Sequence, residues 1–204
     1  MGKVLFDLSV SLDGFMAGPG VSLELPLGEG GERIHQWMSD LAVWREPQGL
    51  AGGQTNKNSE VVDEIDQATG AFVMGRRMFD TGEEPWGPNP PFRRPVFVVT
   101  HHARERLIKE GGTTFTFVTD GPISALAQAR AAAGEKDIRV AGGANIAQQY
   151  LNAGLLDELQ IHLAPVFLGE GVRLFEHMAT HLKLESTRVI ASPSVTHLRF
   201  RIIK

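Results

Sequence analysis

The residue types best suited to binding chemistry stand at two points where strand-like runs of this sequence stop. Residues 75–77 read Gly-Arg-Arg and directly follow the apolar run 71–74, while residues 142–143 read Gly-Gly and separate the strand-like run 138–141 from a helix-like run. Guanidinium groups match phosphate oxygens, and glycines let a ligand approach backbone amides at a helix N-terminus. Both stretches therefore predict contacts with a phosphate-containing ligand.

Each stretch also has a purely structural interpretation. Arg76 and Arg77 could be two solvated side chains on the first turn of a helix, but positive charge is unfavourable at that end, so a basic pair there favours a compensating anion. Gly142 and Gly143 could simply form a turn. The two stretches together support a ligand site better than either does alone.

The pattern is not that of the common NAD-binding fold. The Gly-x-Gly-x-x-Gly spacing is absent, the glycine pair comes late in the chain, and the strand expected over 159–166 has no acidic residue at its end to hold a ribose hydroxyl. What remains is a cradle for a diphosphate and arginines that can hold an additional phosphate. This combination favours NADPH over NADH as the ligand.

Three segments share one arrangement, a buried strand that leads into the start of a helix. They span 71–79, 115–126 and 138–150. In a parallel sheet such strand ends lie on one edge, where the ligands of α/β proteins usually bind. We therefore expect the three segments to meet at one site.

Apolar periodicity predicts an α/β fold with a mainly parallel sheet and a C-terminal antiparallel hairpin. The first strand carries Asp7, Ser9 and Ser11 at alternate positions, which indicates that its other face is fully buried. The last strand alternates apolar and polar residues, as is typical of a half-solvated position. The predicted strands cover 4–12, 71–74, 96–100, 115–118, 138–141, 159–166, 183–190 and 195–203. The predicted helices cover 32–44, a segment capped by Asn58 or Ser59 and stopped by Gly70, 123–133 and 144–152, with a Pro-rich loop over 85–95.

Composition limits the class of protein. The 204 residues are 42% apolar and 22% charged, which fits one folded globular domain over 1–204. Twenty basic and 24 acidic residues give a net charge of -4, so we expect no nucleic-acid partner. No apolar run approaches the roughly 20 residues of a membrane span. The chain has no cysteine, so we expect a cytoplasmic protein without a membrane partner. His101 and His102 would point opposite ways on an extended strand, so we expect no metal site.

Five motifs in order along the chain carry a resemblance to a known family. GRRMFDTG (75–82), VTHHARE (99–105) and VAGGANI (140–146) together resemble the dihydrofolate reductase fold. VSLDGFMAG (10–18) and HLAPVFLGEGVRLF (162–175) resemble more closely the reductase domain of riboflavin biosynthesis and its bacterial relatives. The resemblance covers nearly the whole chain and implies a sheet of about eight strands with NADPH along the strand ends.

The resemblance also implies which residues bind the cofactor. They are Val10 and Ser11 beside the nicotinamide, Gly75, Arg76 and Arg77 at the 2′-phosphate, Thr100 and His101 near the adenine, and Gly142, Gly143, Ala144, Asn145 and Ile146 at the diphosphate. Relatives of this kind are often homodimers, so we expect a homodimer. Residues 20–57 depart from the family pattern, and because they are expected to line the pocket, the sequence does not name the substrate.

Three residues are expected at the substrate. Asp13 ends the first strand, where burial beside an apolar pocket could raise its pKa into the range of a proton donor, although Asp13-Gly14 could equally form only a turn. Trp86 could form a wall for a flat ring or anchor a core. Phe15 completes this set.

The resulting hypothesis is an NADPH-dependent reductase that transfers hydride to a small pterin-like or pyrimidine-like substrate, of the type found in the riboflavin or folate pathway. The alternative is a non-catalytic nucleotide- or pterin-binding protein of the same fold. The phosphate-binding motifs do not separate the two hypotheses, since both would use them.

Overall fold

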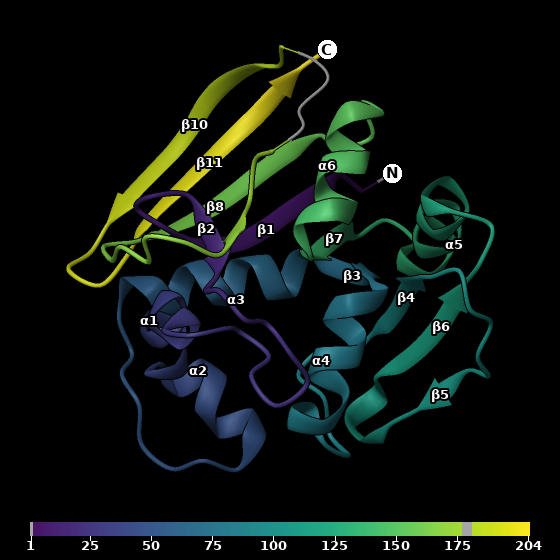
Figure 1. The fold of residues 1–204 in the computed structure, drawn as a ribbon, viewed down its shortest axis with the longest axis horizontal. Coiled ribbons are helices and arrows are strands. Elements are labelled where there is room, and N and C mark those ends of the chain that lie inside the picture. Colours follow the sequence, from purple (N-terminus) through teal and green to yellow (C-terminus); the bar gives the residue numbers. More distant parts are fainter. Residues whose placement is uncertain (1, 177–180) are drawn as a thin grey trace.

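The structure is a computed structural model that describes residues 2–176 and 181–204. Within this part, nine strands form one sheet in the order β10-β11-β8-β1-β7-β3-β4-β6-β5, and β2 and β9 form a small second sheet (Figure 1). The strands from β8 to β6 run parallel, whereas β10, β11 and β5 pair antiparallel. The strands are β1 (Val4–Ser11), β2 (Phe15–Ala17), β3 (Thr69–Gly75), β4 (Pro95–Val99), β5 (Leu107–Ile108), β6 (Thr114–Val118), β7 (Asp137–Gly142), β8 (Glu158–Ala164), β9 (Val172–Arg173), β10 (Lys183–Ala191) and β11 (Thr196–Ile203).

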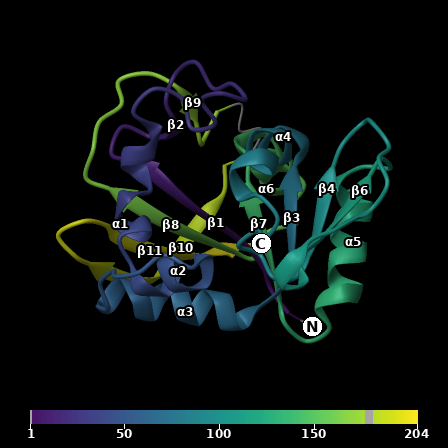
Figure 2. The ribbon, with the colours of Figure 1, turned by 90° about the horizontal axis from the view of Figure 1, so that it is seen from below.

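Helices cover both faces of the sheet (Figures 1 and 2). On one face, α5 and α6 pack on the apolar side chains of the central strands, such as Val73 and Val140. On the other face lie α3, against Leu5, and α4, against Phe72. The helices are η1 (Gly31–Ile34), α1 (Gln36–Ser39), α2 (Ala42–Arg45), η2 (Glu46–Gln48), α3 (Lys57–Ala68), α4 (Arg76–Trp86), η3 (Glu110–Gly112), α5 (Pro122–Ala133) and α6 (Ala144–Asn152).

The predicted fold class is confirmed, including the mainly parallel sheet and the C-terminal hairpin. The sheet has nine strands instead of about eight, because the two-residue β5 adds an edge beside β6. Such a short strand leaves no detectable period in a sequence. The helix α6 has its predicted bounds. The ends of the eight predicted strands agree with the structure within about two residues, as expected for element ends.

The single helix predicted over 32–44 is wrong. Leu41 is extended (φ -85°, ψ 140°) and separates α1 from α2. The backbone there pairs with the following loop: the amide of Ala42 donates to the carbonyl of Gln54 at 2.9 Å, and the amide of Gln54 donates to the carbonyl of Asp40 at 2.8 Å. Ile34, Trp37 and Leu41 are buried, as helical spacing of apolar residues predicts, but the backbone hydrogen bonds of a neighbouring segment interrupt the helix.

Two helix ends also differ from their predictions. The cap of α3 is Asn56 and not Asn58 or Ser59, because the Asn56 side chain accepts from the Asn58 amide at 2.9 Å. The expected Pro-rich loop begins later than residue 85, since Pro85 and Trp86 form the last turn of α4. Trp86 is therefore placed by a helix and not by a loop.

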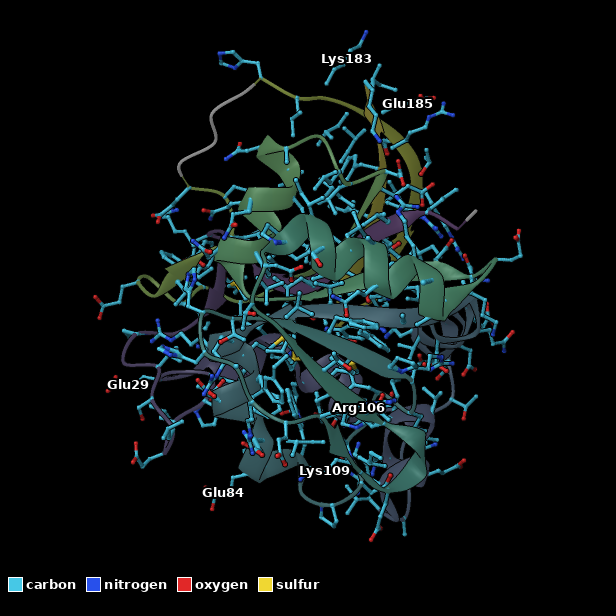
Figure 3. All side chains as sticks on the ribbon, turned by 90° about the vertical axis from the view of Figure 1, so that its right-hand side faces the viewer. Glu29, Glu84, Arg106, Lys109, Lys183 and Glu185 are labelled. Carbon is cyan, nitrogen blue, oxygen red and sulfur yellow. The ribbon has the colours of Figure 1, made fainter. Side chains whose placement is uncertain are left out.

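The outer surface carries charged side chains of both signs. Glu29, Glu84 and Lys183 are labelled among those that point outward in Figure 3. Among the described residues, no helix has the length and apolar composition needed to cross a membrane.

Candidate functional site

A cavity of about 1570 Å³ lies at the carboxyl edge of the parallel strands and continues over the face of the sheet that α3 and α4 cover. Ligand pockets commonly measure roughly 300–1,000 Å³, so this cavity has room for a dinucleotide and a second small molecule. Residues that follow β3, β4 and β7 line it, together with residues from the 20–57 segment, as expected from the sequence.

The ends of β3 and β7 present bare backbone to this cavity. Gly143 caps α6, and a Cβ added to it would meet no atom within 4 Å. A Cβ added to Gly75 would lie 3.7 Å from the Gly143 nitrogen, so the two glycines are neighbours. Gly142 has φ +139°, and a Cβ there would lie 3.0 Å from the sulfur of Met78. The Gly142–Gly143 peptide bond is cis.

Ala144, Asn145 and Ile146 form the first turn of α6 and also line the cavity. The free amides of a helix N-terminus carry partial positive charge and bind anions. This corner therefore combines amide donors with unfilled space, which is the arrangement that the glycine pair predicted.

Arg76 and Arg77 line the same cavity from the start of α4. Arg76 is half-buried; its Nε donates to Asp80 Oδ1 at 2.6 Å and its Nη1 to Thr100 Oγ1 at 3.3 Å. Arg77 is exposed, and its Nη2 donates to the carbonyl oxygen of Val21 at 3.1 Å. Arg77 is thus the less neutralised of the two charges.

Three further predicted residues line the cavity. Thr100 is buried, and its hydroxyl oxygen accepts the amide of His102 at 3.1 Å, while His101 is exposed. Trp86 lies edge to face with Phe92 at 4.9 Å between ring centroids. Trp86 packs on a core and also borders the cavity, and its role as a wall for a flat substrate ring stays a prediction.

Five predicted site residues do not line this cavity. They are Val10, Ser11, Asp13, Phe15 and Gly142. Val10 belongs to the core beneath α5 and α6, and the guanidinium of Arg173 covers the Phe15 ring at 4.5 Å. The assignment of Gly142 to the diphosphate, and of the other four to the nicotinamide or the substrate, stays a prediction.

The expected raised pKa of Asp13 is wrong. The Ser11 hydroxyl donates to Asp13 Oδ1 at 2.6 Å, and the Gly169 amide donates to Oδ2 at 2.7 Å, with the Leu168 amide beside them. These hydrogen bonds, that from Ser11 first, lower the pKa of Asp13 to about 2. The carboxylate therefore joins the end of β1 to the loop after β8, and its ionised form is the stable one.

The segment 115–126 does not reach the cavity either. Its strand, β6, is separated from β3 by β4, and none of its residues lies along the cavity wall. The expected meeting of three segments is wrong, and only those after β3 and β7 come together there. Strand order cannot be read from the sequence of each strand alone.

The floor of the cavity contains polar residues from the middle of neighbouring strands. Asp7 and Ser9 come from β1, Arg139 from β7 and His162 from β8. His162 Nε2 lies 2.7 Å from Asp7 Oδ1, and Arg139 forms an ion pair with the other carboxylate oxygen. Although burial alone would raise the pKa of Asp7, Arg139 and His162 lower it to about 2.

A chain of hydrogen bonds continues from this floor into the protein. His162 Nδ1 lies 2.6 Å from His197 Nδ1, and His197 Nε2 lies 3.0 Å from Asn58 Oδ1. Trp37 packs on both imidazoles, with ring centroids 4.8 and 5.0 Å away. Burial, and secondarily His162, lowers the pKa of His197 to about 4. The floor is therefore anchored from β11 and α3.

Sequence reasoning missed this floor. Asp7 and Ser9 entered the prediction only as the polar alternation of the first strand, and His162 alternates with apolar residues in the run Leu-Gln-Ile-His-Leu. The available signal was a charged or polar residue in strands predicted to be central. Its meaning depends on β8, β1 and β7 being neighbours, which the sequence does not give directly.

Comparison with known proteins agrees with the fold and the order of motifs. The family described as the RibD C-terminal domain matches residues 2–198. The uncharacterized protein YyaP of Bacillus subtilis strain 168 is 25% identical over 198 residues, which cover 93% of this chain and 90% of YyaP.

Solved structures show the same fold at low identity. A Shewanella sp. PV-4 protein named for riboflavin biosynthesis has a TM-score of 0.69 at 20% identity, with full coverage of both chains. Dihydrofolate reductase from Enterococcus faecalis, complexed with NADP(H) and RAB-propyl, has a TM-score of 0.55 at 13% identity, covering 98% of this chain and 97% of that one.

Proposed function

Because the chain belongs to the RibD C-terminal domain family, we propose that it is an NADPH-dependent reductase that acts on a small pterin-like or pyrimidine-like substrate. The observation that carries this proposal is the unfilled space in front of Gly143, beside Gly75 and the two arginines. Backbone amides without side chains are suited to a diphosphate, and a neighbouring guanidinium is suited to a ribose phosphate.

The residues present fit NADPH. Gly143 and the first turn of α6 would hold the diphosphate, and Arg77, with Arg76 behind it, would hold the 2′-phosphate. When bound, the nicotinamide would supply the hydride. Through these contacts the chain would orient the cofactor for the reaction.

The proton donor is not assigned to Asp13, because hydrogen bonds hold that carboxylate in its ionised form. The second hypothesis is a non-catalytic binding protein of this fold. Among the residues predicted from the sequence, Asp13 was the one expected to supply the proton.

Turnover separates the two hypotheses. NADPH is incubated with the protein and a panel of oxidised pterins and pyrimidines, and the loss of reduced-nicotinamide absorbance is followed. Oxidation that depends on both protein and substrate supports the reductase. Tight NADPH binding without oxidation by any member of the panel supports the binding protein. The expected homodimer stays a prediction, which sedimentation of the purified protein tests.

A further inference from the structure

The C-terminal hairpin of β10 and β11 has a charged face and an apolar face, and the charged face is the one turned toward α3. Arg188 and Arg199 both form ion pairs with Glu64 of that helix. Ile190 packs on the small core cluster beneath α3. Where an antiparallel sheet has one solvated face, that face normally carries the polar residues. Here the arrangement is reversed, so the apolar face needs an explanation.

The register of the two strands defines the apolar face. Cross-strand partners project to the same side of a sheet. The face, called the hairpin face below, consists of the three cross-strand pairs Leu184–Ile202, Ser186–Phe200 and Val189–Leu198. None of these side chains is ionisable.

Burial on this side of the sheet decreases from β8 to the edge. Ile161 of β8 is buried in the core that α6 shares, and its neighbours Leu198 and Phe200 of β11 are partly buried against the same core. In β10, Leu184 is 42% and Val189 is 59% exposed. The two hairpin strands extend beyond α6 (Figure 1). The apolar face is therefore continuous with the core but reaches past the helix that covers it.

A further exposed aromatic residue lies on the same side. Phe175 is 48% exposed and follows Leu174, whose carbonyl oxygen accepts a hydrogen bond from Gln148 Nε2 of α6 at 3.0 Å. Contiguous exposed apolar surface is uncommon on monomeric proteins and marks sites of interaction. This side of the sheet is therefore the surface of the described residues best suited to a protein partner.

We propose that the hairpin face packs on the hairpin face of a second copy of the chain, with the two sheets face to face across a two-fold axis. Sheets with apolar inner faces pack about 10 Å apart and share one core. The cavity lies over the opposite face of the sheet, which α3 and α4 cover, so it stays accessible in both copies. The proposal names the surface of the homodimer expected from the sequence and does not rest on the proposed function.

Charge favours a second copy over other partners. In a two-fold interface the same patch comes from both copies, so charged residues near the axis meet their own charge. The hairpin face has no charge, and its contact with itself therefore involves no like-charge repulsion. An anionic surface, such as a membrane, would need basic side chains at the contact. Arg188 and Arg199 are on the other face and are already paired.

The edge of the sheet is a poorer contact than its face. β10 is an edge strand, but its register shifts between Ser186 and Arg188, and Thr187 has no partner in the ladder. A bulge of this kind bends an edge strand and hinders pairing with another strand. Packing through side chains of the hairpin face requires no such pairing.

The proposed contact also bears on the cavity floor. His197 of β11 projects to the α3 side, opposite the hairpin face, and lies 2.6 Å from His162 of the floor. A second copy packed on β11 would stabilise the strand that holds this imidazole. The Tm of the wild type is therefore expected to rise with protein concentration, because association stabilises the folded state.

Sedimentation equilibrium of the purified full chain tests the proposal. We expect the wild type to be a dimer, and Val189→Glu and Leu184→Glu each to raise its dissociation constant at least about 100-fold, because a carboxylate would be buried against an apolar surface. The control is Ile108→Glu, since Ile108 is 78% exposed on β5 at the other edge of the sheet. This control should keep the wild-type constant. A monomeric wild type, or Val189→Glu that dimerises as the wild type does, would overturn the proposal.

A second measurement covers the case in which the glutamate variants do not fold. The chain has no cysteine, so Val189→Cys and Leu184→Cys each introduce a single thiol. A short bismaleimide should give covalent dimers of at least one of these variants and not of Ile108→Cys. Absence of a covalent dimer from both hairpin variants would overturn the proposal. NADPH titration of the wild type separates the two proposals, since a dimer through this face that fails to bind NADPH contradicts only the proposed function.

Discussion

One half of the cavity is formed by backbone, and the other half is formed by side chains. The corner at Gly75 and Gly143 is formed by backbone, with open space where a side chain at Gly143 would stand. The floor at Asp7, Arg139 and His162 is formed by side chains from three adjacent strands, and a chain of hydrogen bonds behind them holds them in place. The first half suits a ligand group that recurs in many molecules, a phosphate, whereas the second consists of charged and polar side chains that hold one another in place.

This difference teaches how each half tolerates change. A site of backbone amides is sensitive to any side chain that fills its space, but little else at the position matters. A site of side chains depends on every partner in its hydrogen-bonded chain, because removal of one partner leaves others buried and unpaired. The variants below probe the two halves separately, in order of expected effect.

The largest effect is expected at the backbone corner. Gly143→Asp places a carboxylate where the diphosphate would bind, and the backbone there (φ -82°) accepts a side chain without penalty. We expect NADPH affinity to fall roughly 100-fold, about 2.7 kcal/mol, with little change in Tm. Isothermal titration measures the affinity and calorimetry the Tm.

The control for that variant is Ile123→Asp. Ile123 is 69% exposed in the first turn of α5 and lies outside the cavity. The substitution therefore adds the same negative charge at the start of a different helix. NADPH affinity should not change. A Gly143→Asp protein that binds NADPH as the wild type does would remove the corner from the cofactor site.

The second effect concerns the stability of the protein and depends on His35, which lines the cavity near His162 of the floor. Burial, with a smaller contribution from His162, lowers the pKa of His35 to about 4, from 6.5 in an unfolded chain. The unfolded chain therefore takes up this proton at a higher pH. The contribution of neutral His35 to the free energy of unfolding is therefore fully present above pH 6.5. It is lost as the pH falls from 6.5 to about 4, and the free energy of unfolding has no further dependence on His35 below that pH.

His35→Gln should remove this part of the pH dependence. Between pH 7 and pH 4 we expect the wild type to lose roughly 2 kcal/mol more unfolding free energy than the variant, allowing for partial solvent screening. Urea unfolding at several pH values measures the difference. The exposed His101 provides the control, because His101→Gln should follow the wild type. Parallel curves for wild type and His35→Gln would contradict the assigned shift.

The third effect separates the two arginines at the cofactor corner. Arg77→Gln should reduce NADPH affinity about tenfold and leave NADH affinity unchanged, because only NADPH has the 2′-phosphate. Arg76→Gln should have a smaller effect, since Asp80 already neutralises part of that charge. Titration of each variant with both nucleotides measures this. Arg104→Gln, whose guanidinium pairs with Glu83 outside the cavity wall, is the control. A larger loss for Arg76→Gln would reverse the assignment.

The smallest effect on binding is expected at Asp13. Asp13→Asn weakens the contacts to the Leu168 and Gly169 amides, so the Tm should fall by a few degrees while NADPH affinity stays within about twofold. Thermal unfolding and titration measure both quantities. An unchanged Tm combined with loss of turnover would restore Asp13 as the proton donor.

The parts of the site that follow single strands could be predicted from the sequence. Glycines and arginines directly after strand-like runs indicated the corner, because the carboxyl ends of parallel strands are where ligands bind, and α6 covers the predicted residues 144–152. These inferences use only local sequence and one general rule of the fold.

The floor could not be predicted in this way. Asp7, Arg139 and His162 are far apart in the sequence and meet only because β8, β1 and β7 are neighbours. The broken helix at Leu41 has the same kind of cause, a backbone partner in Gln54 that no periodicity reveals. The expectation for Asp13 was wrong because its amide partners follow β8, more than 150 residues later.

The central claim is that the backbone corner and its arginines bind NADPH. Isothermal titration of the wild-type protein with NADPH and, in parallel, with NADH tests it most directly. The structure predicts binding of both nucleotides through the diphosphate, with NADPH at least about tenfold tighter through Arg77 and Arg76. Equal affinity for the two nucleotides, or no binding of NADPH, would contradict the account.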